Sequence, residues 1–441
     1  MFKKFFALML CAVMCVTLTA CGGADKNETT DNSSADAAAV VTAEPVVTPE
    51  PFDPIDWETV EANPVSDFTY QVLTDDYVQI DSYIGTNPVM RIPAEIDGVP
   101  VCGVAVDAFR ENTTITHAYM PDSLTVLEDR CFLGCTSLKQ VRLSDDMYMI
   151  RSAVFKGCSE LRVINMPAGL NSVDSSAFSG CASLTEAVFT ENLHSVKDNA
   201  FEDCVSLAKF SAPGLTWLAQ MVFVGCTSLS DMTLFAGCSS INGNSFNGCT
   251  SLQSINLSPI PEDYEYGYLI YENGVLYLAY PGGDSVEAVR MFPGTPVEEV
   301  VLRADTKEIL HSAFYGCQLK SIVIPARVRE IEGNAFKQCP NLENVTLEAG
   351  SNLEYVSGYV FEKCYVLKNV DFSGTDKEIT IADSAFFLDE ALEKVALPAN
   401  MSCSEPLTEV FKYSTNIVVT HNGVDYAYDQ LGNVPITIYE Y

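Results

Sequence analysis

The chain of 441 residues has little of the chemistry that most enzymes use. It contains only four histidines, and no H-E-x-x-H, G-x-S-x-G or phosphate-binding glycine pattern occurs. Adjacent acid pairs such as Asp145-Asp146 and Glu298-Glu299 would point to opposite faces of a strand, so neither pair can form a two-carboxylate centre. The sequence therefore predicts a non-catalytic protein without a cofactor.

Positive charge is also scarce. The chain has 25 Lys and Arg against 59 Asp and Glu, which gives a formal net charge of -34. This balance argues against binding to nucleic acid or anionic lipid through long-range attraction. The calcium-loop pattern D-x-D-x-D-G and the C-x-x-C and Cys/His pairs of zinc sites are missing too, so no metal site is predicted. We interpret the acidity as a source of solubility, with attraction of cationic partners as the alternative.

A long apolar run occurs only once, at the N-terminus. Lys3-Lys4 precede the run from Phe5 to Thr19, which is too short to span a bilayer comfortably and is typical of a secretory signal. The run ends in Leu18-Thr19-Ala20-Cys21, which resembles the L-x-A-C lipobox of bacterial lipoproteins. That resemblance implies cleavage before Cys21 and attachment of acyl chains that hold the protein on the membrane. An ordinary secreted protein with a chance cysteine at this position is the alternative.

A polar segment follows the predicted signal. Residues 21–65 are rich in Asp, Glu, Thr, Ser, Ala and Pro, and such a composition cannot bury enough apolar surface to fold. We expect the lipidated Cys21 to be followed by a disordered, acidic and proline-rich tether over the rest of this range.

The sequence has one regular feature, a phenylalanine about every 23 residues. The recurring residues are Phe109, Phe132, Phe155, Phe178, Phe201, Phe223 and Phe246, and then Phe314, Phe336, Phe361 and Phe386. Nine of them are followed three residues later by a cysteine, namely Cys135, Cys158, Cys181, Cys204, Cys226, Cys249, Cys317, Cys339 and Cys364. A fixed period of this length predicts a solenoid whose coils bury their apolar faces against one another.

Each repeat also contains the pattern L-x-x-V/I-x-L, as in the segment from Leu138 to Leu143. Its alternation of apolar and polar residues predicts a short strand with one buried face. Stacked coils would align these strands in parallel and place the phenylalanine rings in one internal column. The cysteines recur at one equivalent position per repeat, which favours buried thiols, although bridges between neighbouring coils remain the alternative. Cys102, Cys131, Cys238 and Cys403 lie off this pattern and are not assigned.

The regular spacing is interrupted once and flanked by irregular ends. Asn273-Gly274 lies between alternating apolar residues in a tyrosine-rich stretch, which predicts a β-hairpin that projects from the array. The tyrosines suit either recognition or packing within a sheet. The predicted organisation is a signal peptide at 1–20, the tether at 21–65, an N-terminal cap at 66–107, repeats at 108–257, a hairpin-containing insertion at 258–305, repeats at 306–400 and a C-terminal cap at 401–441.

The motif Ala-Phe-x-x-Cys-x-x-Leu, together with the segment from Ile92 to Val101 and the Asn273-Gly274 hairpin, resembles the BspA-type leucine-rich repeats of bacterial surface proteins. The resemblance covers about residues 68–441 and departs from the pattern at Thr113-Thr114 and at Asp389, where cysteine would be expected. It implies a β-rich solenoid, namely a leucine-rich repeat array with parallel strands, an inserted hairpin and terminal caps. It also implies a surface-exposed bacterial lipoprotein that recognises host or microbial proteins or mediates adhesion.

The outward positions of the repeated strands form the candidate binding face. These positions are Lys139, Gln140, Arg142, Arg162, Asn165, Thr185, Glu186, Lys209, Asp231 and Asn256. Lys139, Arg142 and Arg162 would form a basic patch in an otherwise acidic protein, but polar residues are expected on any solvated sheet. A structural surface scaffold without a specific ligand and a carbohydrate-binding accessory protein are the alternative functions.

Overall fold

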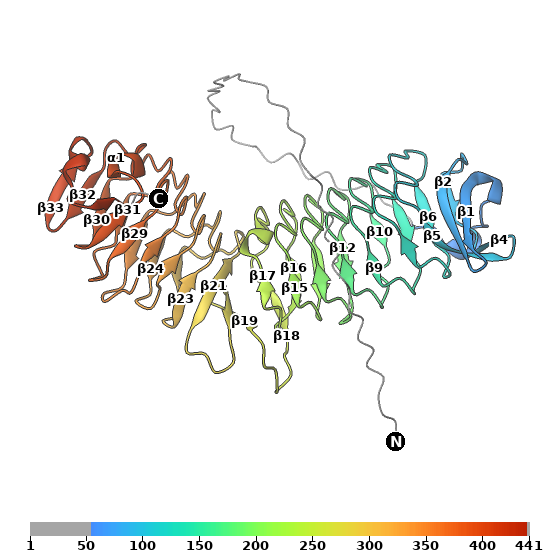
Figure 1. The fold of residues 1–441 in the computed structure, drawn as a ribbon, viewed down its shortest axis with the longest axis horizontal. Coiled ribbons are helices and arrows are strands. Elements are labelled where there is room, and N and C mark those ends of the chain that lie inside the picture. The colour runs from blue at the N-terminus through green and yellow to red at the C-terminus, as the bar shows by residue number, and fades with distance from the viewer. Residues whose placement is uncertain (1–53, 439–441) are drawn as a thin grey trace, which may run out of the picture. The chain divides into compact units, whose positions relative to one another are not determined.

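The computed structural model describes residues 54–438, which form a parallel β-solenoid (Figure 1). The predicted signal peptide, Cys21 and the larger part of the predicted tether lie outside these residues. Each coil of about 23 residues contributes one strand to each of two walls. We call the strands of the L-x-x-V/I-x-L pattern the front strands and those that follow them in each coil the rear strands. No helix within 54–438 has the length and apolar character needed to cross a membrane.

The front strands form three parallel ladders. The first contains β3 (Val89–Arg91), β6 (His117–Tyr119), β8 (Gln140–Arg142) and β10 (Val163–Ile164). The second contains β12 (Glu186–Val188), β14 (Lys209–Ala212), β16 (Asp231–Phe235) and β18 (Asn256–Ser258). The third contains β22 (Glu299–Val301), β24 (Ser321–Ile324), β26 (Asn344–Leu347), β28 (Asn369–Asp371), β30 (Lys394–Leu397) and β32 (Val418–His421), with β33 (Val424–Ala427) antiparallel at its edge.

The rear strands also stack in parallel. One ladder consists of β9 (Met149–Ile150), β11 (Ser172–Val173), β13 (Ser195–Val196), β15 (Trp217–Leu218) and β17 (Ser240–Ile241). A longer one runs through β21 (Val286–Met291), β23 (Thr306–Ile309), β25 (Glu330–Ile331), β27 (Tyr355–Val356), β29 (Ile379–Ile381), β31 (Met401–Cys403) and β34 (Thr437–Ile438).

Further strands and a few short helices lie outside these ladders. At the N-terminal end the antiparallel pair β1 (Phe68–Thr74) and β2 (Tyr77–Tyr83) joins β5 (Val99–Val104), which pairs with β4 (Glu95–Ile96) and β7 (Val126–Leu127). In the described part of the chain the helices are few and short: η1 (Trp57–Thr59), η2 (Val65–Asp67), η3 (Gly243–Phe246), α1 (Leu407–Val410) and η4 (Tyr428–Asn433).

The phenylalanine column is confirmed. The ring centroids of Phe155 and Phe178 lie 5.5 Å apart at 17°, and those of Phe178 and Phe201 lie 5.2 Å apart at 10°. A second column begins with Phe314 and Phe336, whose centroids are 4.9 Å apart at 8°. All of these rings are fully buried. Because the rings repeat at nearly the spacing of neighbouring strands, about 4.8 Å, each ring covers the face of the next.

The repeated cysteines are buried free thiols, as the single equivalent position per coil predicts. Each thiol donates to the carbonyl oxygen of the corner residue in the preceding coil, as Cys181 does to Phe155 at 3.2 Å and Cys204 to Phe178 at 3.1 Å. The same carbonyl oxygen also accepts from the backbone N–H of the cysteine in its own coil, as Phe155 O does from Cys158 at 3.1 Å, so the thiol is its second donor. The thiol therefore has a polar role as well as an apolar one. Burial raises the pKa of the Cys204 thiol to about 12, which keeps it protonated as a donor.

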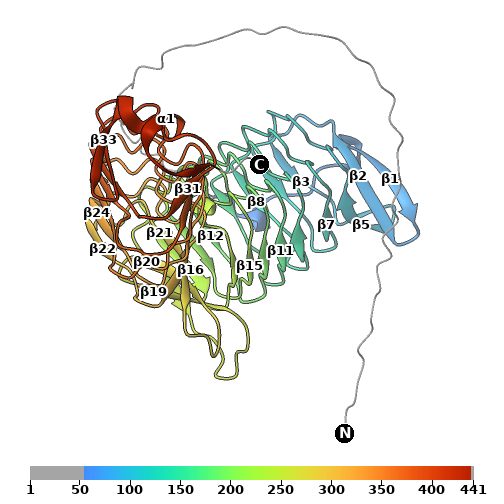
Figure 2. The same ribbon diagram turned by 60° about the vertical axis from the view of Figure 1, so that its left-hand side comes forward.

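The predicted hairpin exists but does not project from the array. Strands β19 (Tyr268–Glu272) and β20 (Val275–Ala279) are antiparallel, and β20 also pairs with β21, so the hairpin lies at the edge of the long rear sheet. Every residue of β20 is buried. Leu276 and Leu278 pack into the core of the preceding coils, whereas Val275 and Tyr277 pack into the core of the following coils. The strand therefore separates two hydrophobic cores, and it is the loops beside it that extend outward (Figure 2).

The 23-residue spacing in fact resumes before Phe314, at Met291, whose carbonyl oxygen accepts from the Cys317 thiol at 3.2 Å. Residues 286–305 thus belong to a regular coil, although we predicted them within the insertion. Gly294 stands where this coil would carry its cysteine. The fully buried Arg290 lies at this junction and donates to the carbonyl oxygen of Phe246 at 3.5 Å, so a guanidinium replaces the missing thiol.

The coil of Phe386 has the carboxyl group of Asp389 in place of the thiol, and this side chain is fully buried. Its Oδ1 accepts from the backbone N–H of Cys364 at 2.8 Å. Burial raises the pKa of Asp389 well above its ordinary value, and the nearby Cys364 and Glu362 raise it further. The folded protein therefore holds a proton that the unfolded chain releases near pH 4.

We expect Asp389→Asn to stabilise the protein as the pH rises from about 4 towards neutrality. The raised pKa makes the wild type lose up to about 1.4 kcal/mol of stability per pH unit in this window, and an amide carries no such dependence. Melting temperatures of both proteins between pH 3 and 8 measure the effect. Equal melting temperatures at pH 7 would show that Asp389 titrates normally.

Candidate functional site

The second front ladder holds the exposed part of the predicted face. Glu186, Lys209 and Asp231 lie side by side in register on β12, β14 and β16. Their charges alternate, and Lys209 Nζ lies 3.9 Å from Asp231. Thr185 and Asn256 are also exposed at the two ends of this stretch. These five positions lie along the second front ladder, and the apolar residues that alternate with them, such as Ala187 and Phe210, are buried in the core.

Gln140 does not belong to this exposed face. Its side chain is buried, because residues that precede the repeats cross over it. The Ile55 backbone N–H donates to Gln140 Oε1 at 2.8 Å, and Gln140 Nε2 donates back to the Ile55 carbonyl oxygen at 3.3 Å. The Gln140 side-chain amide thus bonds to both backbone groups of Ile55, as a neighbouring strand would do in a sheet.

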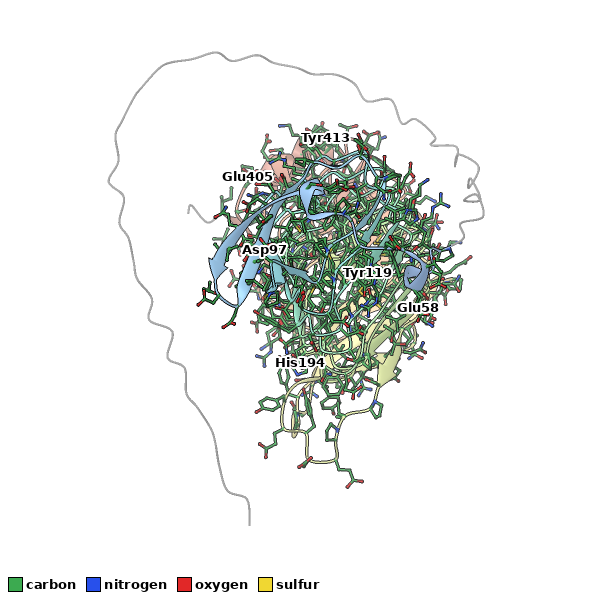
Figure 3. All side chains as sticks on the ribbon, turned by 90° about the vertical axis from the view of Figure 1, so that its right-hand side faces the viewer. Glu58, Asp97, Tyr119, His194, Glu405 and Tyr413 are labelled. Carbon is green, nitrogen blue, oxygen red and sulfur yellow. The ribbon has the colours of Figure 1, made fainter. Side chains whose placement is uncertain are left out.

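We call residues 55–63 the strap. Trp57 packs on Tyr119 at 5.5 Å between ring centroids and on His117 at 6.4 Å, both of them outward residues of β6. Arg91 of β3 donates to the carbonyl oxygens of Trp57 and Val60 and lies over the Tyr119 ring at 4.5 Å. Figure 3, viewed from the N-terminal end, shows Glu58 of the strap beside Tyr119. The end of the predicted tether, residues 54–65, is therefore folded and covers the first front strands.

The strap forms despite its polar composition because the folded sheet offers partners that the sequence of the segment does not reveal. Asn63 is buried, and it pairs with Arg91 through its backbone N–H at 2.9 Å and its Oδ1 at 2.7 Å. Aromatic and guanidinium groups of β3 and β6 supply the apolar surface that the segment lacks.

The predicted basic patch is largely neutralised. Lys139 Nζ lies 3.5 Å from the Glu160 carboxylate, and Arg142 Nη2 lies 2.8 Å from that of Asp145. Arg162 is half-buried on the next coil, where its backbone N–H donates to the Lys139 carbonyl oxygen at 2.9 Å. These cations consequently offer less free positive charge than the sequence suggests.

Asn165 has a structural role on the same surface. Its Oδ1 accepts from the Leu143 backbone N–H at 2.6 Å, and its Nδ2 donates to the Leu143 carbonyl oxygen at 3.1 Å. The side chain extends the short β10 ladder by one residue pair, so it is not free to bind a ligand.

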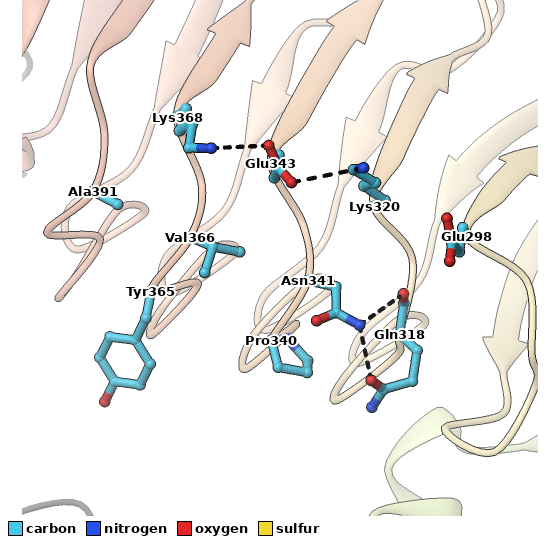
Figure 4. A pocket seen from close by; sticks show the side chains of 10 residues that line it. All are labelled: Glu298, Gln318, Lys320, Pro340, Asn341, Glu343, Tyr365, Val366, Lys368 and Ala391. Atoms are coloured by element: carbon cyan, nitrogen blue, oxygen red, sulfur yellow. Dashed lines mark hydrogen bonds and ion pairs between the residues drawn. The ribbon is translucent and has the colours of Figure 1, made fainter.

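A ladder of alternating charge on the third front sheet was not predicted. Glu298, Lys320, Glu343, Lys368 and Glu393 occupy equivalent positions in successive coils. Glu343 lies between two lysines, 4.0 Å from Lys320 and 3.0 Å from Lys368 (Figure 4). The lysines lower the pKa of Glu343. The alternation of sign at intervals of 22 to 25 residues was visible in the sequence.

A groove of about 470 Å³ runs beside this ladder, along the starts of the front strands. A hydrogen bond links two side chains of neighbouring coils that line the groove: Asn341 Nδ2 donates to Gln318 Oε1 at 3.1 Å. Tyr365, which is 55% exposed, lies at its far end. The groove is open, and three of its four charged side chains, Lys320, Glu343 and Lys368, are joined in ion pairs. The arrangement therefore suits surface contacts better than enclosure of a small molecule.

Two exposed valines lie on the same sheet. Val301 of β22 and Val323 of β24 are register partners, and they are 73% and 54% exposed. The residues beside them on the outward face are Glu299 and Ser321. The alternation along each strand predicts that these positions face water. Only the structure shows that the two valines are neighbours and form one apolar spot. A paired apolar spot on a polar sheet is the kind of surface at which proteins associate.

No arrangement for metal binding is found within residues 54–438, where no three His, Cys, Asp or Glu side chains are grouped suitably. Two of the four histidines are described by their surroundings. His421 is buried and lies within hydrogen-bond distance of the Asn422 side chain. Partial burial lowers the pKa of His117.

Comparison with known families gives one clear match. The BspA type leucine rich repeat region is found in six copies, over residues 104–226, 149–265 and 289–418. Together these ranges cover more than half of the chain. No curated protein matches the chain in sequence.

Two solved structures are similar over most of their length. A leucine-rich cell surface protein of Faecalibacterium prausnitzii is 26% identical with a TM-score of 0.66, and the match covers 85% of this chain and 98% of that protein. A leucine-rich repeat protein of Bacteroides ovatus is 20% identical with a TM-score of 0.54, covering 81% and 99%. The second similarity concerns the fold alone.

We expect Gln140→Ala to loosen the strap while leaving the repeats folded. The change removes both hydrogen bonds to Ile55, each worth about 0.5–1.5 kcal/mol. Limited proteolysis should then cut within residues 55–63 faster than in the wild type. Gln220→Ala, at an exposed glutamine away from the strap, is the matched control. Equal cleavage rates for all three proteins would contradict the role of Gln140.

Proposed function

The chain belongs to the BspA-type leucine-rich repeat family, and from this we propose that it is a non-catalytic surface protein whose repeat array recognises another protein or mediates adhesion. The family consists of repeat proteins, and the Faecalibacterium prausnitzii protein is named as a cell surface protein. Within residues 54–438 most of the large apolar side chains fill the stacked cores, and the groove beside the charge ladder is open. Such a surface supports contact with a large partner rather than chemistry on a small one.

The observation that carries this proposal is the exposed pair Val301 and Val323. On these two strands the core is filled by Val300 and Ile322, which point inward and are buried. Val301 and Val323 point to the opposite face of the sheet, so they add nothing to that core. A partner that covered both valines would remove apolar surface from water, and the polar residues nearby would form the rim of such an interface.

The groove beside the charge ladder extends this surface. Glu298, Lys320, Glu343 and Lys368 give it two negative and two positive charges, so a partner would be selected by the pattern of charge rather than by net attraction. The strongly acidic chain would disfavour acidic partners at longer range. We place the recognition surface on the third front sheet for these reasons, with the exposed residues of the second front ladder as a further contact area.

Anchoring completes the proposal. The Leu18-Thr19-Ala20-Cys21 motif supports acylation of Cys21 and retention on the outer side of the bacterial membrane. The strap fixes Ile55 against β8, so the chain that leads from the anchor would join the array on its front side. A scaffold without a specific ligand is the competing function, and only a binding experiment separates the two.

Replacement of both valines, as Val301→Glu and Val323→Glu, should abolish capture of the partner. Immobilised full-length protein would be offered surface proteins of host cells and of other microbes, with bound proteins identified by mass spectrometry. Val72→Glu, at an equally exposed valine of β1, is the matched control and should capture normally. All three proteins should melt at the same temperature, because the valines are exposed. Background binding by the wild type would favour the scaffold function.

Cys21→Ser should release the protein from the membrane. The change removes the thiol that would carry the acyl chains, and a single uncleaved apolar run of this length anchors poorly. Metabolic labelling with a palmitate analogue and fractionation of cells measure the effect, with Cys15→Ser as the control that keeps both label and location. A labelled, membrane-bound Cys21→Ser protein would refute lipidation at this residue.

A further inference from the structure

The rear wall of the array contains one residue that its neighbours do not explain. Trp217 is one of two tryptophans in the chain and lies on β15 with its side chain 55% exposed. It is in register with Ser195 of β13 on one side and Ser240 of β17 on the other. A large aromatic residue in a ladder of serines gains little from its own sheet, because an indole contributes most when it is buried.

The small neighbours leave a hollow on each side of the indole. The hollow towards β13 measures about 420 Å³ and is lined by Ser195, Lys197 and Asp198 as well as Trp217. The hollow towards β17 measures about 410 Å³, with Gln220, Ser240 and Asn242 among its lining residues. Neighbouring strands are only about 4.8 Å apart, so side chains larger than serine at these two positions would fill both spaces.

The lining of the two hollows is rich in groups that bind hydroxyls. Asp198 lines both of them and offers a carboxylate; its Oδ1 accepts from the Gln220 backbone N–H at 3.2 Å, and its two oxygens have further lone pairs for hydroxyls. Ser240 and Ser195 can donate or accept, and the amides of Gln220 and Asn242 can do both. A flat aromatic face flanked by such groups matches a ring with C–H bonds on its face and hydroxyls around its edge.

Charge narrows the choice of ligand. Lys197, the cation that lines the first hollow, is already paired with Asp174 at 2.6 Å. The hollows therefore hold a carboxylate but no free cation to receive an anionic group, and the whole chain is strongly acidic. The negative charge would repel an acidic sugar, whereas a neutral sugar would experience no such repulsion.

We propose that Trp217 is the platform of a binding site for neutral saccharides on the rear wall. One pyranose ring would stack on the indole through its C–H face, which is attracted to the electron-rich face of the aromatic ring. The hydroxyls at its edge would bond to Asp198 and to the polar side chains of the two hollows. Each hollow is large enough for a sugar unit, so a chain of sugars would lie across the rear strands.

This site is separate from the proposed protein-recognition surface. It lies on rear strands β13, β15 and β17, whereas Val301 and Val323 lie on front strands β22 and β24. Saccharide binding and protein recognition can therefore fail independently.

Tryptophan fluorescence offers a direct test, because the chain has only Trp57 besides Trp217. Full-length Trp57→Phe protein in detergent would be titrated with tetrasaccharides of β-1,4-glucose, β-1,3-glucose, β-1,4-mannose and β-1,4-xylose, and with an anionic tetragalacturonate. We expect a saturable change in emission with at least one neutral sugar and none with the anionic one.

Calorimetry with the sugar that binds then tests the geometry. Trp217→Ala should weaken binding about tenfold or more, and Ser240→Leu should do the same by filling one hollow. Ser172→Leu occupies the equivalent position on β11, outside the lining of both hollows, and should bind like the wild type. The melting temperature of Trp217→Ala should stay unchanged, which separates lost binding from lost folding.

Three results would overturn the proposal. The first is that none of the four neutral sugars changes the emission, and the second is that Trp217→Ala binds as tightly as the wild type. The third is that Trp217 governs capture of a protein but of no sugar, which would make the rear wall a protein interface. The Val301→Glu, Val323→Glu protein should bind the sugar normally, so a failure of this site and a failure of the protein-recognition surface remain distinguishable.

Discussion

The structure depends on the stacking of one aromatic ring per coil. Ring centroids along the first column are 4.8 to 6.0 Å apart, close to the spacing that hydrogen-bonded strands impose on the backbone. The rings can therefore stay in contact only if every coil has nearly the same length. Loss of one ring would leave a cavity between two coils at a cost of about 3–5 kcal/mol. This constraint explains the near-constant period and the burial of every ring.

Hydrogen bonding at the corners follows from the same stacking. Each tight corner places a carbonyl oxygen inside the wall, where it accepts from a backbone N–H of its own coil and from the thiol of the next coil. Some coils that lack the thiol have other groups at this position. Arg290 reaches the Phe246 carbonyl at the junction, Asp389 is buried in the coil of Phe386, and the Ser414 hydroxyl of the following coil donates to the Asp389 carbonyl oxygen at 2.9 Å. The cysteine ladder is thus a way to satisfy buried polar groups rather than a set of potential disulfides.

The outer positions of the coils are free of this constraint. Many of their side chains contact the equivalent residues of neighbouring coils, as Lys209 does Asp231 and Glu343 does Lys368, and such contacts favour ladders of alternating charge. The same freedom allows residues that serve no internal purpose, such as the paired valines of the front wall and the tryptophan of the rear wall. Function in this protein would therefore lie in departures from the outer pattern, held on a scaffold that does not need to move.

The sequence by itself determined the solenoid, its parallel strands, the buried thiols and the existence of the hairpin at Asn273-Gly274, because these depend on residues that recur at fixed intervals along the chain. It did not show that Met291 continues the period, since methionine does not match the aromatic signal, nor that β20 faces two cores. Only the tertiary structure decided that Gln140 holds the strap, because its partner Ile55 lies 85 residues away and belongs to a polar segment. The exposure of Trp217 was likewise decided there, since a strand of two residues has no readable alternation and its surroundings come from coils on either side.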